Sequence, residues 1–468
     1  MYILGNIENS PEFHQQFIEA IQVSCNENEL KPISFKSGAH NHEFPVKKNN
    51  GSQISTDGIF KSDWLYKHQC LLPSVVILMF EIKLDCTVPD WIQQESMIFD
   101  CYTRFKHQLS HRDAKVTVVL IRTGDESKER EVFEERFVSL KRHLNIEAKS
   151  IFSLTLAETN ATSQNAKKIG KYVRECSSNY YKAHTKRLKR MEKLIGPRSA
   201  SPLLFARYNF KAAIYCDFLG SGDKSLKHYQ DSFFSLSNYS EVHHPDDHDQ
   251  VDTFSAWINY CICKYYLLSS SQAEMHHQFR IHMNIFGRRY RGANPPRHFL
   301  WLANQYLIIE NMLTTISGSS VTTEADTKYY FINAAKYISK AVRSAEKEAG
   351  KRGIEFLSPT LDFPSFLGKI YSNCTVTESR YIGGVPWLID NADSSKDQRV
   401  PSEIVSSFML QEYAHEKYSD LILSYLQRAL EAANPTHERS LAYIKSLIGN
   451  QVKHFFSFSL LIFLELFA

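Results

Sequence analysis

The sequence predicts a small α/β domain with a parallel sheet, followed by an α-solenoid of helical hairpins that resembles tetratricopeptide arrays. In the first third, apolar strands alternate with amphipathic helices, the order that produces parallel strands with crossover helices. Beyond residue 201, helices come in pairs of about 40 residues, the period of stacked hairpins. The composition, with 43% hydrophobic and 23% charged residues, is that of a globular protein.

The α/β domain is predicted at residues 1–160. Its clearest strand is PSVVILMFEI at 73–82, a continuous apolar run typical of a strand buried on both faces. Further strands are predicted at 115–122 and 148–156, and helices at 90–109 and 126–144.

Parallel sheets often bind nucleotides at the carboxyl ends of their strands. The turn KLDCTVPDW after the first long strand has no glycine to let a phosphate approach the backbone. The turn RTGDES after the second has acidic residues beside its helix start, and these would repel phosphate. We therefore expect a structural α/β domain with no cofactor.

A connecting basic helix is predicted at residues 161–200. It contains KAHTKRLKRMEK at 182–193, which is rich in Lys and Arg. A solvated helix face is the ordinary explanation, and contact with an acidic partner or an anionic membrane is the alternative.

The helical array is predicted at residues 201–450, with a long loop at 351–400. Small residues recur where large aromatic side chains of a neighbouring helix must fit, and we expect these alanines to be buried. They are Ala212, Ala213, Ala256, Ala303, Ala334 and Ala335. The predicted helices are 202–219 with 226–237, 251–268 with 271–286, 298–316 with 328–347, and then 402–432 and 436–449.

Charge and cysteine content exclude several classes of protein. A net charge of +4 over 468 residues gives no whole-protein field that would favour nucleic acid or a membrane surface, so only local basic runs can matter. The nine cysteines form no C-x-x-C pair, and the N-terminus has no signal peptide, so we expect reduced thiols in the cytoplasm.

The segment 451–468 forms an apolar C-terminal tail. Its run HFFSFSLLIFLELFA has fewer apolar residues than the roughly 20 needed to span a bilayer. A membrane-anchored adaptor that uses this tail is an alternative function.

VHHPDDHD at 242–249 resembles the zinc motif H-x-H-x-D-H, with His243, Asp247 and His248 in three of its four positions. Pro245 occupies the fourth position and offers no metal ligand, so a linker between helices is favoured over a metal-dependent hydrolase at 243–249. His276, His277 and His282 lack the spacing of two ligands on one helix face, and we expect His282 to be buried and hydrogen-bonded. GSGDKS at 220–225 is predicted to be a turn between helices with Ser221 or Asp223 as N-cap. We predict no catalytic, cofactor-binding or metal residues.

Colinear stretches along the chain resemble the family of subunit eleven of the TRAPP (transport protein particle) tethering complex, whose helical part is the foie gras domain. In the α/β region they are PISFKSGAHNHEFP (32–45), GIFKSDWLYKHQCLLPSVVILMFEI (58–82) and AKVTVVLIR (114–122). In the helical region they include FARYNFKAAIYCDF (205–218), WINYCICKYYL (257–267), QFRIHMNIF (278–286), WLANQYLIIENM (301–312) and YIGGVPW (381–387). Members of that family are much longer than this chain.

The resemblance implies a non-enzymatic scaffold in vesicle tethering between endoplasmic reticulum and Golgi. Its implied partners are the other TRAPP subunits and, through the whole complex, a Rab-family GTPase. It implies a cytoplasmic protein, peripheral at cis-Golgi or ER-Golgi intermediate membranes through the complex, that binds no nucleic acid.

Overall fold

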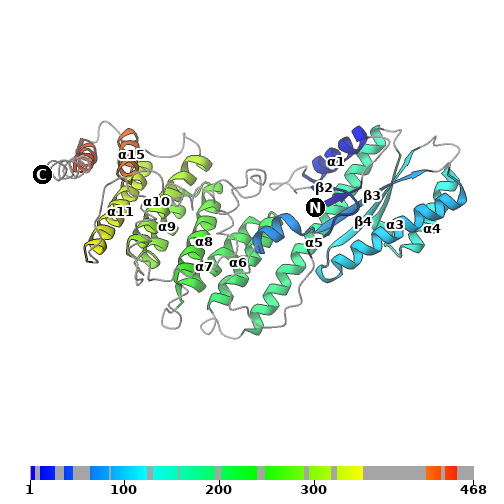
Figure 1. Cartoon of the computed structure of the whole chain (residues 1–468), viewed down its shortest axis with the longest axis horizontal. Coiled ribbons are helices and arrows are strands. Elements are labelled where there is room, and N and C mark those ends of the chain that lie inside the picture. Colours follow the sequence, from blue (N-terminus) through cyan, green and yellow to red (C-terminus); the bar gives the residue numbers. More distant parts are fainter. Residues whose placement is uncertain are drawn as a thin grey trace. The chain divides into compact units, whose positions relative to one another are not determined.

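The structure is a computed structural model that describes most of the chain up to residue 351 and two shorter segments beyond it (Figure 1). It divides into two compact units. Unit 1 comprises Met1–Ile54, Asp63–Gly196 and Lys211–Ser225, and unit 2 comprises Ser55–Ser62, Pro197–Phe210 and Leu226–Ala468. The described residues are 2–5, 11–26, 36–45, 64–83, 86–123, 130–155, 159–195, 202–239, 248–288, 295–317, 324–351, 418–433 and 438–450.

Unit 1 is built on a five-stranded parallel sheet in the order β2-β1-β3-β4-β5. The three predicted strands are present, and the predicted fold class is confirmed. The last strand starts three residues late, because Ala148–Ser150 form a 3-10 turn. The strands are β1 (Tyr2–Leu4), β2 (Lys36–Gly38), β3 (Val75–Lys83), β4 (Lys115–Thr123) and β5 (Ile151–Thr155).

Strands β1 and β2 were not predicted. Each has three residues, which is too short for a periodicity to be recognised. Both owe their conformation to pairing, since Tyr2 faces Lys36 on one side and Val76 on the other.

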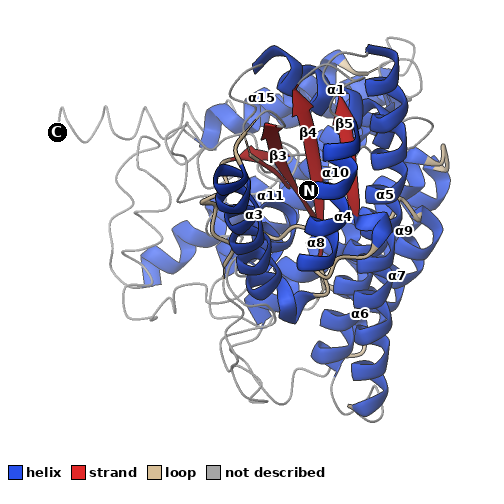
Figure 2. Cartoon of the chain, turned by 90° about the vertical axis from the view of Figure 1, so that its right-hand side faces the viewer, coloured by secondary structure: helices blue, strands red, loops and turns tan. Residues whose placement is uncertain are grey.

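Helices cover both faces of the sheet, drawn in red in Figure 2. Alternate residues of β3 face opposite ways, so Val76 and Leu78 belong to one core cluster and Val75 and Ile77 to the other. Residues of α3 and α4 pack in the first cluster, and residues of α1 and α5 pack in the second. The helices are α1 (Pro11–Asn26), α3 (Val88–Leu109), α4 (Arg130–His143) and α5 (Thr159–Leu194).

The hairpin helices follow in the predicted order. Short turns join α6 to α7 and α8 to α9, and neighbouring helices pack through aromatic rings, as Phe279 of α9 does against Tyr306 of α10. All six alanines predicted to be buried are at most 5% exposed. The helices are α6 (Pro202–Phe218), α7 (Gly222–Ser237), α8 (His248–Leu268), α9 (Gln272–Ile285), α10 (Pro295–Ser317), α11 (Glu324–Lys351) and α15 (Tyr418–Glu431).

A further helical segment covers residues 438–450 and contributes Ile444 to a core shared with α10, α11 and α15. The predicted loop 351–400 lies outside the described residues except for Lys351. The part of helix 402–432 before Tyr418 lies outside them too.

Candidate interaction surface on helix α5

The usual ligand position of an open α/β sheet is the point where the strand order reverses, here between β1 and β3. Gly5 follows β1 there with a φ of 120°, and a Cβ atom at residue 5 would overlap the Met79 carbonyl and the His40 ring. His40 donates from Nε2 to the Met79 carbonyl at 2.9 Å and stacks on Phe80 with ring centroids 4.5 Å apart. Burial lowers the pKa of His40. A side chain of the protein therefore fills the space beside Gly5.

The two halves of helix α5 differ in environment: its first half is packed against the sheet, and its second half carries exposed basic side chains. Its first half packs on α1 and β5, and Ala166, Ile169 and Val173 are fully buried there. These apolar side chains fix the side of the helix that faces the sheet.

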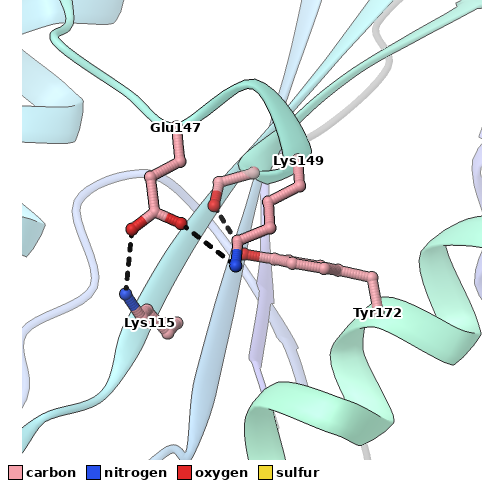
Figure 3. Close-up of polar contacts among 5 residues, drawn as sticks. Lys115, Glu147, Lys149 and Tyr172 are labelled. Carbon is pink, nitrogen blue, oxygen red and sulfur yellow. Dashed lines mark hydrogen bonds and ion pairs between the residues drawn. The ribbon is translucent and has the colours of Figure 1, made fainter.

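Polar contacts hold the middle of α5 to the beginnings of the strands, and the one made by Tyr172 is drawn in Figure 3. Tyr172 shares a hydrogen bond of 2.5 Å with the Ser150 hydroxyl just before β5. Ser177 shares one of 3.0 Å with Ser74 just before β3. Burial raises the pKa of Tyr172, so its hydroxyl is protonated at neutral pH.

Beside the Tyr172 contact, an exposed carboxylate bridges two lysines, also drawn in Figure 3. Glu147 lies 3.6 Å from Lys115 Nζ and 3.5 Å from Lys149 Nζ. All three side chains are more than half exposed, so the pairs contribute little stability. Glu147 directly precedes the 3-10 turn that carries Ser150.

The second half of α5 is held by what we call the aromatic cluster, which comprises Trp64, His68, Tyr180, Tyr181, His184, Tyr215 and Phe218. Tyr215 of α6 is its centre, with ring centroids 5.3 Å from His184, 5.6 Å from His68 and 6.0 Å from Tyr181. Lys211 Nζ lies 4.7 Å from the Trp64 ring.

Burial, followed by the charge of Lys211, lowers the pKa of His68 to about 3. Burial disfavours the charged form of tyrosine as well, and so it raises the pKa of Tyr181 and Tyr215. At neutral pH these rings are therefore uncharged, and the cluster packs as an apolar contact.

The opposite side of α5 is exposed and basic. We call Lys182, Lys186, Lys189, Arg190 and Lys193 the basic face, and all five are exposed. Apart from the adjacent Lys189 and Arg190, their successive spacings are three and four residues, which places them in one stripe of the helix. Arg187 and Leu194 adjoin the stripe, and Leu194 is 79% exposed. Met191 is 42% exposed, but helical spacing places it on the side of Tyr180 and His184. The run predicted at 182–193 is thus a solvated helix face in the isolated chain.

The other predicted sites have different outcomes. His282 is fully buried, and its Nε2 donates to Gln305 Oε1 at 3.3 Å, which confirms the prediction for this histidine. Helix α7 begins at Gly222, so only Gly220 and Ser221 of GSGDKS lie between the helices, and Gly222–Ser225 form the first turn of α7. Of the two predicted N-cap residues, Ser221 directly precedes the helix, whereas Asp223 lies inside it. The remaining candidates His243 and Asp247 lie outside the described residues, as does the tail 451–468, and His248 is described only as the first residue of α8.

Within the described ranges, no three His, Cys, Asp or Glu side chains gather in a way that could hold a metal ion. None of the helices that the structure describes is both long and apolar enough to cross a bilayer. The described cysteines with resolved side chains, as predicted, are free thiols: Cys86, Cys101, Cys176, Cys216, Cys261 and Cys263.

Comparisons with known proteins agree with the resemblance found in the sequence. The family model described as "Trafficking protein particle complex subunit 11 N-terminal domain" matches residues 48–163. Trafficking protein particle complex subunit 11 of Gallus gallus is 26% identical over 321 residues, which cover 65% of this chain and 27% of that protein. The proteins of the same name from Bos taurus and Homo sapiens are 26% identical over 330 residues, covering 67% of this chain and 28% of theirs. The matched region thus spans little more than a quarter of the length of these relatives.

Proposed function

Since this chain is a relative of trafficking protein particle complex subunit 11, we propose that it is a non-enzymatic scaffold subunit of a TRAPP-type vesicle-tethering complex. The observation that carries the proposal is the extent of the similarity. Up to 330 aligned residues are more than unit 1 contains, so the similarity extends into the helical unit.

The architecture supports a binding role. Arrays of helical hairpins present extended surfaces on which other proteins can bind. We propose the domain division 1–160, 161–200 and 201–450, in which the α/β domain and the helical array bind other TRAPP subunits and the tail 451–468 is dispensable.

The finer parts of the proposal follow from the resemblance. The chain would act in ER-to-Golgi transport, and the whole complex would activate a Rab-family GTPase. It would be cytoplasmic and peripheral at cis-Golgi or ER-Golgi intermediate membranes, held there through the complex.

Affinity purification of the tagged chain from its own cells, followed by mass spectrometry, tests the proposal. The full chain and a variant without residues 451–468 are compared, with an unrelated protein that carries the same tag as the control. We expect TRAPP subunits to co-purify with both forms. Their absence from both would contradict the scaffold role.

The same pair of proteins separates the scaffold from the adaptor alternative. A membrane-anchored adaptor needs its tail, so its membrane association would require detergent for release and would disappear on deletion of 451–468. A scaffold held through the complex keeps its membrane association in both forms, as measured by fractionation of cell membranes.

A further inference from the structure

We propose that the basic face of α5 binds directly to the surface of an anionic lipid bilayer. This goes beyond the scaffold role, because it gives the chain a membrane contact of its own in addition to one made through a complex. It requires no partner protein, so it can be tested on the purified chain.

The geometry of the basic face suits a planar surface. An α-helix turns by about 100° per residue, so the five side chains lie within an arc of about 100° around the helix axis. A rise of about 1.5 Å per residue places Lys182 and Lys193 roughly 16 Å apart along that axis. The opposite side carries Tyr180, Tyr181 and His184 in the aromatic cluster. Burial of that side therefore turns the five cations outward together.

The charge of this segment is almost entirely positive. Between residues 182 and 193 the only acidic residue is Glu192, which helical spacing places outside the arc of the basic face. Clusters of four to eight Lys and Arg on an amphipathic helix are typical of segments that bind anionic lipids.

The side chains favour lipid over an acidic protein. Four of the five residues of the basic face are lysines, and lysine is depleted in protein interfaces whereas arginine is enriched. Lysine is a flexible point charge, which suits headgroups that move laterally in a bilayer. Leu194 lies beside the basic face at helical spacing and is exposed, as are the apolar residues that enter the headgroup region in interfacial helices.

Flotation of the purified full chain with lipid vesicles tests the proposal. One set of vesicles contains phosphatidylcholine alone, and the other contains phosphatidylcholine with about one third phosphatidylserine. The test variant combines Lys182→Glu, Lys186→Glu and Lys189→Glu. The matched control combines Lys106→Glu, Arg142→Glu and Arg280→Glu, which makes the same charge change at exposed positions on α3, α4 and α9.

We expect the unaltered chain to float with anionic vesicles and not with neutral ones, and added salt to weaken the binding. The basic-face variant should bind at least ten-fold more weakly, whereas the control should stay within about two-fold. Circular dichroism checks that each variant is folded. If the test variant is not folded, the change of the same three lysines to Gln replaces it.

Three results would overturn the proposal. The unaltered chain could fail to bind anionic vesicles, the basic-face variant could bind as well as the unaltered chain, or the control could lose binding equally. Binding to immobilised polyglutamate that depends on the basic face, without binding to vesicles, would assign the face to an acidic protein instead. None of these results depends on whether TRAPP subunits co-purify, so the two proposals can fail separately.

Discussion

At the scale of single residues, burial keeps histidines uncharged in both units. His282 is fully buried, and the rings of Phe233, Phe286 and Trp301 lie within about 6 Å of its own ring. Burial lowers its pKa to about 3, despite the opposing effect of the hydrogen bond to Gln305. An unfolded histidine has a pKa of about 6.5. The folded state therefore does not take up a proton that the unfolded state binds between these two pH values.

We predict that His282→Gln makes the stability of the helical unit less dependent on pH. The lowered pKa contributes to the free energy of unfolding. This contribution is complete above pH 6.5 and is lost as the pH falls toward 3. Between pH 7 and pH 5 the variant should lose about 2 kcal/mol less of its unfolding free energy than the unaltered chain. Urea unfolding at both pH values measures the difference. The exposed His277 lies on the same helix, and His277→Gln is the control; equal pH dependence in all three proteins would contradict the prediction.

The burial of His282 could be predicted because Met275, Phe279 and Phe286 lie at helical spacing around it. Its partner Gln305 could not, because it lies 23 residues further on, and their contact depends on how α9 packs against α10. The aromatic cluster could not be predicted either, because it too depends on how separate elements pack together. His68 and Tyr215 are far apart in the sequence, and no spacing rule links them.

At the scale of elements, the contact between Tyr172 and Ser150 tests how α5 is held to the sheet. We predict that Tyr172→Phe and Ser150→Ala each destabilise unit 1, and that the two effects are coupled by about 1 kcal/mol. The coupling arises because either change alone removes the same hydrogen bond of 2.5 Å. Thermal or urea unfolding of the two single variants and the double variant measures it. Strictly additive effects would show that the bond contributes no stability.

The start of α3 offers a second prediction. Thr87 is its N-cap, and the Thr87 hydroxyl oxygen accepts a hydrogen bond from the Asp90 amide at 3.4 Å. Thr87→Ala should lower the unfolding free energy by about 1 kcal/mol, whereas Thr87→Ser, which keeps the hydroxyl, should change it by only a few tenths. If both variants lose the same amount, the capping bond is not the cause.

The long elements could be predicted because their patterns extend over many residues. The continuous apolar run predicted at 73–82 became β3, and the helix predicted at 90–109 became α3 with a start two residues earlier. The polar sequence Lys36–Gly38 has no such pattern and becomes a strand only by pairing with β1. The basic run 182–193 could be read directly, but which of its residues share an exposed face depends on where the aromatic cluster holds the helix.

At the scale of the whole molecule, unit 1 is not one continuous piece of chain. Residues Lys211–Ser225 belong to it, although helices predicted from 202 onward were assigned to the array by their sequence. These residues supply Lys211, Tyr215 and Phe218 to the contacts around α5.

We therefore predict that a fragment of residues 1–225 unfolds at a higher temperature than a fragment of residues 1–200. The shorter fragment lacks the partners of Trp64, Tyr181 and His184, and so it exposes rings that are packed together in the longer one. Differential scanning calorimetry measures both temperatures. A third fragment, 1–225 with Tyr215→Ala, separates the effect of this ring from that of length and should resemble the shorter fragment. Equal unfolding temperatures for the first two would contradict the prediction.

The division of unit 1 along the chain has a consequence for its synthesis. Strand β1 precedes the other strands of the unit, whereas its partner β3 ends at Lys83 and the last part of the unit ends at Ser225. At about 5 to 20 residues per second, a ribosome needs roughly 10 to 45 seconds to translate that length. During this interval the apolar strands β3 and β4 emerge before α5, which covers one face of the sheet, has been translated. We expect the nascent chain to depend on ribosome-associated chaperones until α6 has been made.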